Sequence, residues 1–535
     1  MDIAIPLALC LLILGLSVVV SKLIQQFLRP RKSQGRYPPG PKPLPLIGNT
    51  LDVPVKGVGE KYLEWGRRYN TDLVHISTLS DHIVVINKRE VAEELLEKHA
   101  AKYSGRPDIP VLKLIGWDCN VALMDNGQEW RNHRRICQQH FNKQAAQSFQ
   151  DIQLNKARKM LQSLLSSPEN YSLYSNMFST SISMAMMYGY EVESLDDPAV
   201  KAANKSIEVG SPLTIPGGTL INVFPFLRHI PGWVPGAVSQ RQVALGAFMT
   251  REMQRIPLED LKKRMAEGKA SPSFVSNFFE KKNTVGASDE EESMTYNIAH
   301  TVYAAASDTT ISATGTFFYC MAANPAVQKK AQEEIDRITG GSQLPDFSDR
   351  EAMPYLEAVY REVMRYRPPL PLTVSRSLSE DDHYRDYFFP KGTLIFANIW
   401  GMTHDEDVYP EPDVFKPERF FNVDGKLNDN DRIMAFGFGR RICAGQHIAS
   451  STMWIIIASI LASFNISNAK DEFGNDIPLN DEYDDFGLLA QENDEMLDLA
   501  KVECSAKIDR RGTVELIASW VAVYMEAKGS NNRIA

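Results

Sequence analysis

The apolar positions of the chain recur mainly at helical spacing, which predicts a mainly α-helical fold. Helices are expected at Glu60–Tyr69, Arg89–His99, Gly127–Phe141, Lys143–Ser166, Tyr171–Tyr188, Pro235–Glu267, Thr295–Ala323 and Pro354–Tyr366. Short strands are expected at Leu73–Thr78, His82–Asn87, Thr373–Ser377 and Thr393–Asn398. The polar run Gly286–Ser293 is expected to be a break. Because no linker-like segment divides the helical body, we expect one large domain with small peripheral β-sheets.

The chain begins with an apolar run, Ile3–Val20, which basic residues follow. A membrane-spanning helix needs about 20 such residues, and basic residues keep their side of the membrane cytoplasmic. A cleaved signal peptide is the alternative, but no small-residue cleavage site follows. We expect a single-pass anchor at 1–22, a basic and proline-rich hinge at 23–49, and a main domain at 50–510 on the cytosolic side.

Composition and charge narrow the classes of function. Of the 535 residues, 44% are hydrophobic and 23% are charged, which is ordinary for a globular protein with a large core. The net charge of −9 gives no general electrostatic support to a nucleic-acid partner. The six cysteines have no paired spacing, which indicates neither a disulfide framework nor a zinc site. A reducing, cytosol-facing compartment fits best.

The stretch Phe436–Gly445, FGFGRRICAG, places Cys443 in a glycine-punctuated loop that leads into an apolar helix. A cysteine thiolate is a soft iron ligand, and as an axial ligand it favours O–O cleavage. Amides at the start of the next helix can donate to the sulfur, and Arg441 is spaced to reach a carboxylate at a cofactor's edge. The alternative is a buried structural cysteine, the commoner fate of a lone thiol.

Two further patterns place candidate functional residues on predicted helices. Trp130 and Arg134 share one helix face and form a clamp for carboxylates; the alternative is an inward Trp beside a solvated Arg. Asp308 and Thr309 lie in an apolar helix, where an acid beside a hydroxyl suits a proton relay. The alternative role of Thr309 is to bond back to the preceding turn and bend the helix.

Glu362 and Arg365 are three residues apart on an expected helix, and Arg419 in the segment Pro417–Phe420 would complete a buried ionic triad with them. Arg376 is another candidate partner for cofactor carboxylates.

These elements occur in one order along the chain, and together they resemble the cytochrome P-450 superfamily, the haem-thiolate monooxygenases. The segments YLEAVYREVMRYRPPLPL and HDEDVYPEPDVFKPERF are similar to the fungal secondary-metabolism branch of that superfamily. Within the branch, the chain is similar to the O-methylsterigmatocystin oxidoreductase and tryptamine hydroxylase types.

The resemblance implies a role for each candidate residue. It implies that Cys443 is the axial iron ligand of a haem b and that Asp308 and Thr309 deliver protons during oxygen activation. It implies that the haem propionates bind Trp130, Arg134, Arg376 and Arg441, and that a structural triad is formed by Glu362, Arg365 and Arg419.

The resemblance also implies a membrane-bound redox partner. Electrons would come from NADPH through a separate flavoprotein reductase, with cytochrome b5 as a second candidate donor. Only 535 − 443 = 92 residues follow the cysteine, too few for flavin and nicotinamide domains. The expected location is the endoplasmic reticulum membrane, with the catalytic domain facing the cytosol.

The sequence departs from the family pattern at two places. Ala306 stands where the family often has Gly, which predicts a slightly tighter oxygen groove. An acidic insertion, 489–500, precedes Val502–Ile508, which we interpret as the displaced last strand of the family. The tail at 511–535 has no assigned role.

The substrate class follows from the expected cavity walls, Gly105–Asn120, Ser206–Gly232, Val302–Ala305 and Leu370–Thr373. They are mainly apolar, which suits a lipophilic terpenoid or polyketide. Two other readings keep the haem: an oxygen-independent isomerase or dehydratase, against which Asp308 and Thr309 argue, and a non-enzymatic membrane haem protein. Ligation by His447 instead of the cysteine is the least favoured alternative.

A group of basic residues is expected around the cysteine side of the domain: Arg131, Arg135, Lys143 and Arg440. They would either steer an acidic flavodoxin-like partner or be ordinary solvated charges.

Overall fold

The computed structural model describes residues 35–45, 47–78, 81–215, 218–471, 473–479, 483–486, 489–492 and 500–504. The predicted anchor at 1–22, the start of the predicted hinge and the tail at 511–535 lie outside the described residues.

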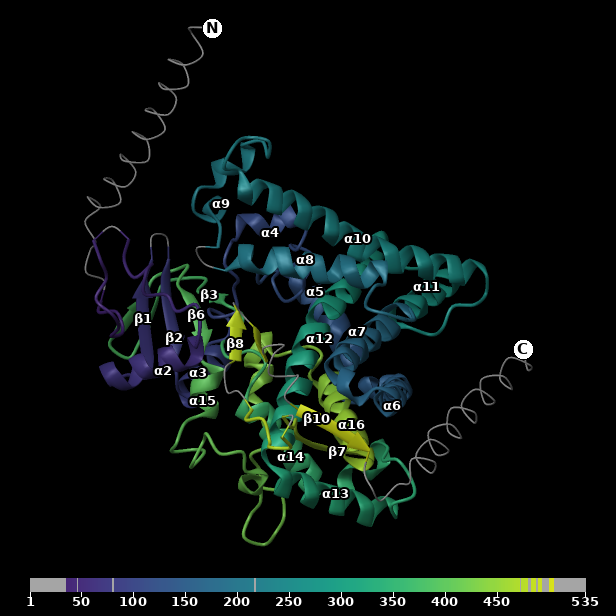
Figure 1. Ribbon diagram of the computed structural model, residues 1–535. Helices are drawn as coiled ribbons and strands as arrows, with labels where there is room; N and C mark the ends of the chain where they lie inside the picture. Colours follow the sequence, from purple (N-terminus) through teal and green to yellow (C-terminus); the bar gives the residue numbers. More distant parts are fainter. Residues whose placement is uncertain are drawn as a thin grey trace.

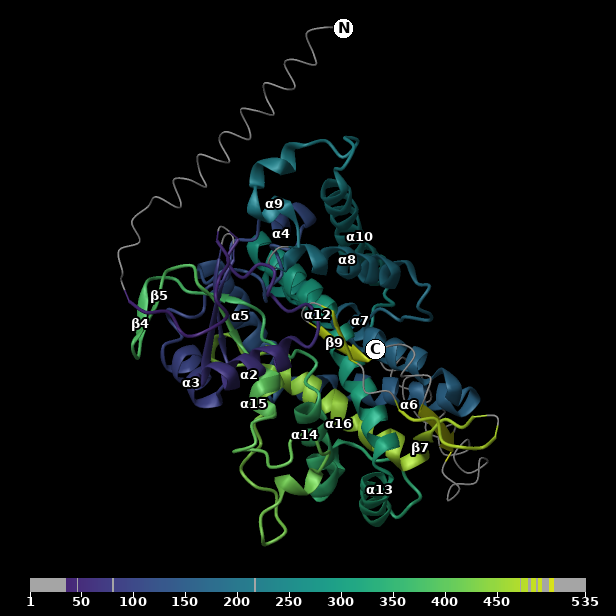
Figure 2. The same ribbon diagram turned by 60° about the vertical axis from the view of Figure 1, so that its left-hand side comes forward.

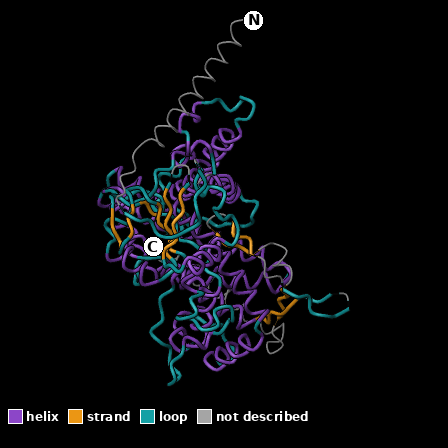
Figure 3. Tube along the Cα trace, turned by 90° about the vertical axis from the view of Figure 1, so that its left-hand side faces the viewer, coloured by secondary structure: helices purple, strands orange, loops and turns teal. Residues whose placement is uncertain are grey.

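Helices make up most of the described chain, which confirms the predicted mainly α-helical class (Figures 1 and 3). They are α2 (Val58–Tyr69), α3 (Arg89–Glu93), α4 (Pro110–Ile115), α5 (Gln128–Phe141), α6 (Gln150–Ser166), α7 (Tyr171–Tyr188), α8 (Pro198–Thr214), α9 (Leu220–Val223), α10 (Val238–Ala266), α11 (Phe274–Val285), α12 (Asp289–Ala323), α13 (Pro325–Thr339), α14 (Pro354–Tyr366), α15 (Ile399–Thr403) and α16 (Gln446–Ser463). The π turn Glu94–Lys98 continues α3.

The strands are short: β1 (Leu73–Ser77), β2 (His82–Ile86), β3 (Arg376–Ser377), β4 (Asp382–Tyr384), β5 (Tyr387–Phe389), β6 (Leu394–Ala397), β7 (Phe464–Asn468), β8 (Tyr483–Phe486), β9 (Leu489–Glu492) and β10 (Ala500–Cys504). The largest sheet has the order β1-β2-β6-β3, in which β2 and β6 run parallel and the other pairs antiparallel. Val84 and Ile86 face one core cluster and Val85 faces another, as the alternation of a strand requires.

The predicted break at Gly286–Ser293 is confirmed at residues 286–288, between the end of α11 at Val285 and the start of α12, but it is shorter than predicted because α12 begins at Asp289. The hydroxyl of Ser288 accepts from the Glu291 N–H (3.1 Å) and the Glu291 carboxylate accepts from the Ser288 N–H (3.0 Å). This capping box starts a helix in a polar run. Six described helices, α4, α8, α9, α11, α13 and α15, have no counterpart among the predicted elements.

The central helix of the body is α12, which packs against α7, α14 and α16 (Figures 1 and 2). Of the helices in the described residues, α16 alone has the length and hydropathy of a membrane span, and 72% of it is buried inside the protein. It is therefore a core helix, and its first turn lies next to Cys443.

The predicted C-terminal strand Val502–Ile508 falls partly on β10, which pairs antiparallel with β7 and places Val502 opposite Ile466. Residues 505–508 lie outside the described residues. The first residues of the predicted insertion form β9, which pairs with β8 in a hairpin.

Candidate active site

Cys443 lies in the loop that ends where α16 begins. Its backbone N–H donates to the Phe436 carbonyl (2.9 Å), and the N–H of Gly445, the N-cap of α16, donates to its sulfur. Burial raises the pKa of the thiol, while the Gly445 N–H and the charge of Arg134 oppose that rise. The side chain nevertheless keeps open surface, so the sulfur borders a space enclosed by protein rather than bulk water.

Arg441 and Trp130 form one unit beside this loop. The guanidinium carbon of Arg441 lies 4.0 Å from the centroid of the Trp130 ring, and its Nε donates to the Ser104 carbonyl (2.9 Å). Both Nη atoms of Arg441 and Nε1 of Trp130 are buried and have no hydrogen-bond partner among the described residues. Because each unpaired buried donor costs about 1–3 kcal/mol, these atoms indicate a ligand with acceptor oxygens.

The charges closest to Arg441 are mostly positive. Burial, followed by the charges of Arg376 and Arg134, lowers the pKa of Arg441 to about 9, and Asp125 opposes this. Burial likewise lowers the pKa of Arg376 to about 10. Arg376 also donates from Nη2 to the Phe438 carbonyl (2.6 Å), which ties it to the cysteine loop.

Arg106 belongs to the same cluster and is missing from the predicted site. Its Nη1 donates to the Val374 carbonyl (2.9 Å). Burial, then the charges of Arg441 and Arg376, lowers the pKa of Arg106 well below its usual value. No local pattern marks it, because a single arginine before a proline is common in loops.

The residues present fit a haem. Trp130, Arg106, Arg134, Arg376 and Arg441 direct donors and positive charge toward one region, and buried like charges of this kind require anionic partners. The two propionate carboxylates of a haem would supply them, since guanidinium and carboxylate pair through charge-assisted hydrogen bonds. Cys443 would supply the iron ligand. The structure therefore brings together the predicted cofactor-binding residues.

The predicted relay residues lie on α12. Burial raises the pKa of Asp308, so its carboxyl keeps a proton to higher pH than a free aspartate does. The Thr309 hydroxyl donates to the Ala305 carbonyl (2.8 Å), which is the back-bond considered above. From α7, the Ser179 hydroxyl donates to the Ser307 carbonyl (2.7 Å). Ala305 is exposed although it lies in the middle of a central helix, so this stretch also borders an open space.

Glu362, Arg365 and Arg419 form the triad that the sequence analysis places there. Glu362 is fully buried and lies 2.7 Å from Arg365 Nε and 3.0 Å from Arg419 Nε. Arg365 also donates to the carbonyls of Thr403 (2.9 Å) and Pro412 (2.8 Å). The triad thus fastens α14 to the segment that leads to the cysteine loop.

The predicted cavity walls at 105–120 and 206–232 meet where α4 packs against α8, and α10 packs against both helices. Val111, Ile115 and Leu213 form a small core of their own there. Nε1 of Trp117 donates to the hydroxyls of Ser206 and Thr250 (both 3.1 Å). The two walls are therefore joined through a mostly apolar contact.

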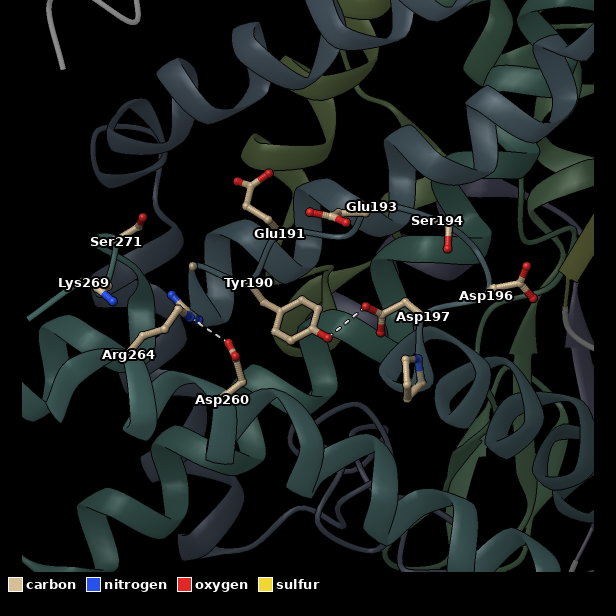
Figure 4. A pocket seen from close by; sticks show the side chains of 12 residues that line it. Tyr190, Glu191, Glu193, Ser194, Asp196, Asp197, Asp260, Arg264, Lys269 and Ser271 are labelled. Atoms are coloured by element: carbon tan, nitrogen blue, oxygen red, sulfur yellow. Dashed lines mark hydrogen bonds and ion pairs between the residues drawn. The ribbon is translucent and has the colours of Figure 1, made fainter. Parts of the chain in front are cut away.

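A separate surface cleft of about 570 Å³ lies at the ends of α7, α8 and α10 (Figure 4). None of the predicted site residues lines it. Several of its carboxylates are engaged: Asp260 pairs with Arg264 (2.7 Å), Asp196 pairs with Lys201 (2.8 Å), and Asp197 accepts from the Tyr190 hydroxyl (2.9 Å) while capping α8. The described residues that line the cleft therefore show nothing comparable to the unpaired buried donors near Cys443.

Comparison with known proteins covers nearly the whole described chain. The family model described as Cytochrome P450 matches residues 38–493. Cytochrome P450 monooxygenase ple1 of Rhodocybe pseudopiperita is 39% identical over 460 residues, 85% of this chain and 87% of its own length. Cytochrome P450 monooxygenase COX2 of Coprinopsis cinerea is 36% identical over 84% of this chain and 86% of its own. Tryptamine 4-monooxygenase of Psilocybe cyanescens is 32% identical over 88% of this chain and 94% of its own.

Proposed function

The chain belongs to the cytochrome P450 family of monooxygenases, and from this premise we propose that it oxidises a lipophilic small molecule with O₂ and with electrons from NADPH. The observation that carries the proposal is the position of Cys443, whose sulfur accepts from the Gly445 N–H close to the unpaired buried donors of Arg441 and Trp130. When bound, a haem supplies the iron centre at which dioxygen is activated.

The residues of the chain bind the cofactor, orient it and deliver protons. Cys443 holds the cofactor from one side, and the Gly445 N–H at the start of α16 stabilises its negative charge. Arg441 and Trp130 orient the cofactor through its carboxylates. Asp308, whose pKa burial raises, is the proton source that we propose, and Thr309 holds a hydroxyl one residue further along α12 to pass a proton toward the reacting oxygen.

The direct test compares turnover in the complete mixture with turnover when substrate, NADPH or O₂ is left out in turn. Membranes containing the full chain and a P450 reductase are expected to form an oxygenated product only with substrate, NADPH and O₂ together. Product formation without O₂ would instead support the isomerase or dehydratase reading. The absence of any product or substrate-induced spin-state change across lipophilic compounds would support the non-enzymatic reading.

Thr309→Ala is expected to separate electron consumption from product formation. Without the hydroxyl, proton delivery is misdirected, and product formed per NADPH should fall by at least about tenfold while hydrogen peroxide rises. Thr309→Ser keeps the hydroxyl and should retain most of the coupling. The measurement is the ratio of product and peroxide to NADPH consumed, and an unchanged ratio in Thr309→Ala would remove Thr309 from the relay.

We propose that the reductase docks on the exposed basic residues Arg131, Arg135, Lys143 and Arg440. Lys143 lies near enough to His447, on the first turn of α16, for its charge to lower the pKa of that imidazole after burial has done so. Reversing Lys143 and Arg440 to Glu should slow the first electron transfer by about tenfold at low ionic strength and less in high salt. The same reversal of exposed Lys113 and Lys201 is the control, and equal rates in both double variants would contradict this docking surface.

The proposed location is the endoplasmic reticulum membrane. A second surface beyond the predicted anchor supports it, since Leu220, Phe226 and Trp233 are 63%, 61% and 82% exposed. No Asp or Glu occurs from Val209 to Arg251, although the chain carries a net charge of −9. Exposed aromatic and basic residues favour an anionic lipid surface. In a chain shortened by residues 1–34, Phe226→Ser with Trp233→Ser should reduce sedimentation with phosphatidylserine vesicles, and unchanged sedimentation would exclude this contact.

A role in secondary metabolism, with a terpenoid or polyketide as substrate, is also proposed. Its support is the mainly apolar composition of the predicted cavity walls at 105–120 and 206–232. Binding titrations that follow the haem spin state should show tighter binding of terpenoids or polyketides than of arylalkylamines. The opposite order of affinities would contradict this proposal and would instead support a substrate like that named for the tryptamine 4-monooxygenase of Psilocybe cyanescens.

A further inference from the structure

The π turn Glu94–Lys98 packs against the cysteine loop at Gly439. Gly439 has a φ of +56°, and a Cβ at that position would lie 2.1 Å from the Leu96 carbonyl oxygen. The loop and the π turn are therefore in direct backbone contact, at a distance that only glycine permits. A π turn of this kind is rare and often occurs at functional sites.

The side chain of Glu97 reaches from this π turn into the loop. Its Oε1 accepts from the backbone N–H of Gly439 (3.1 Å) and from Nη2 of Arg432 (2.6 Å). Partial burial favours a higher pKa for Glu97, but Arg432, the Gly439 N–H and the charge of Arg376 outweigh it and keep the pKa below its usual value.

Arg432 extends the same contact along the loop. Its Nη2 also donates to the Gly437 carbonyl (3.4 Å), and its guanidinium carbon lies 4.6 Å from the centroid of the Phe438 ring. Glu97 and Arg432 thus hold three consecutive residues, 437–439. That turn is connected to the cysteine through the Ile442 N–H, which donates to the Gly439 carbonyl (3.0 Å).

We infer that Glu97 is a positioning residue for the thiolate of Cys443, and this inference rests on the proposed haem-thiolate function. By fixing the Gly439 N–H, Glu97 sets the direction in which the loop enters α16. Without that bond, the turn would keep the contacts of Arg432 with Gly437 and of Arg376 with Phe438, but Gly439, at positive φ, would be less firmly held. The sulfur would then lose its alignment with the Gly445 N–H.

Loss of the Glu97 side chain should change the position of the thiolate but change the free energy of unfolding only slightly. Glu97 is 34% exposed, and such partly solvated ion pairs add little to the free energy of unfolding. Glu93 provides a matched control, because it also binds Arg432 (3.1 Å) and Arg89 (2.7 Å), while none of its hydrogen bonds in the structure reaches the loop.

The experiment compares full-length Glu97→Ala, Glu97→Gln and Glu93→Ala with the natural protein, each loaded with haem, reduced and exposed to carbon monoxide. The readout is the ratio of the thiolate-ligated Soret band to the band of the form that has lost the thiolate. Glu97→Ala should shift this equilibrium about tenfold toward the latter, as expected for one charge-assisted hydrogen bond. Glu97→Gln keeps an acceptor oxygen and should shift it less, by about threefold. Glu93→Ala should keep the natural ratio.

Thermal unfolding measured in parallel should show similar small changes for Glu97→Ala and Glu93→Ala. A natural band ratio in Glu97→Ala, or an equal shift in Glu93→Ala, would overturn the inference. If Glu97→Ala does not accumulate as folded protein, a natural ratio in Glu97→Gln would overturn it. The absence of any thiolate band in the natural protein would overturn the proposed haem-thiolate function itself, before any variant is compared.

Discussion

Replacing Cys443 with serine is expected to abolish monooxygenase activity and the thiolate-specific band of the reduced carbon monoxide complex. A serine hydroxyl keeps its proton at neutral pH, so it supplies neither the negative charge nor the soft donor atom that the sulfur provides. Activity should fall by more than about 100-fold, since changing a group that merely supports a metal ligand already costs up to that factor. The measurements are the reduced carbon monoxide spectrum and product formed per haem.

Two controls identify the ligand. Cys137→Ala removes a buried thiol on α5, whose pKa burial raises to about 11, and it should leave the band in place. His447→Ala removes the histidine one turn beyond Cys443 and should leave it as well. A band that persists in Cys443→Ser and disappears in His447→Ala would contradict thiolate ligation and restore the histidine alternative.

The features that sequence alone predicts are those that local spacing determines. Glu362 and Arg365 are three residues apart, so a helix brings them together whatever else the fold does. The boundaries of α7 and α14 coincide with the predicted ones because Pro354 begins α14 and Gly189 ends α7 in a left-handed conformation.

The features that sequence alone does not predict are contacts between distant segments. The spacing of Trp130 and Arg134 predicts that they share a helix face, but it does not predict that the Trp130 ring stacks on Arg441 of the cysteine loop. Arg106 and Glu97 reach the site from a loop and a π turn whose residue patterns are ordinary. Their roles come from the tertiary approach of those segments to β3 and the cysteine loop, which no periodicity encodes.

Glu362→Ala is expected to prevent accumulation of folded, haem-containing protein. The substitution leaves the guanidinium groups of Arg365 and Arg419 buried without their carboxylate, and breaking a buried ion pair in this way costs about 3–5 kcal/mol. That is a large part of the roughly 5–15 kcal/mol that stabilises a typical folded domain. Haem content and the denaturant midpoint are the measurements. Glu406→Gln, at an exposed ion pair with Arg67, is the control and should change stability by less than about 1 kcal/mol.

A double-mutant cycle distinguishes a charge effect from a packing effect at the triad. Glu362→Gln keeps the shape of the side chain and an acceptor oxygen but removes the charge, so its cost should come from the two unpaired arginines. Adding Arg419→Gln removes one of those charges, and the double variant should therefore be less destabilised than the sum of the two single variants. Strict additivity would mean that Glu362 and Arg419 contribute independently, so that the ionic contribution of Glu362 would come from Arg365 alone. Arg419 also donates to the Pro410 and Val414 carbonyls. A favourable coupling energy between Glu362 and Arg419 would therefore show that their charge pairing holds residues 410–419, which precede the cysteine loop, in place.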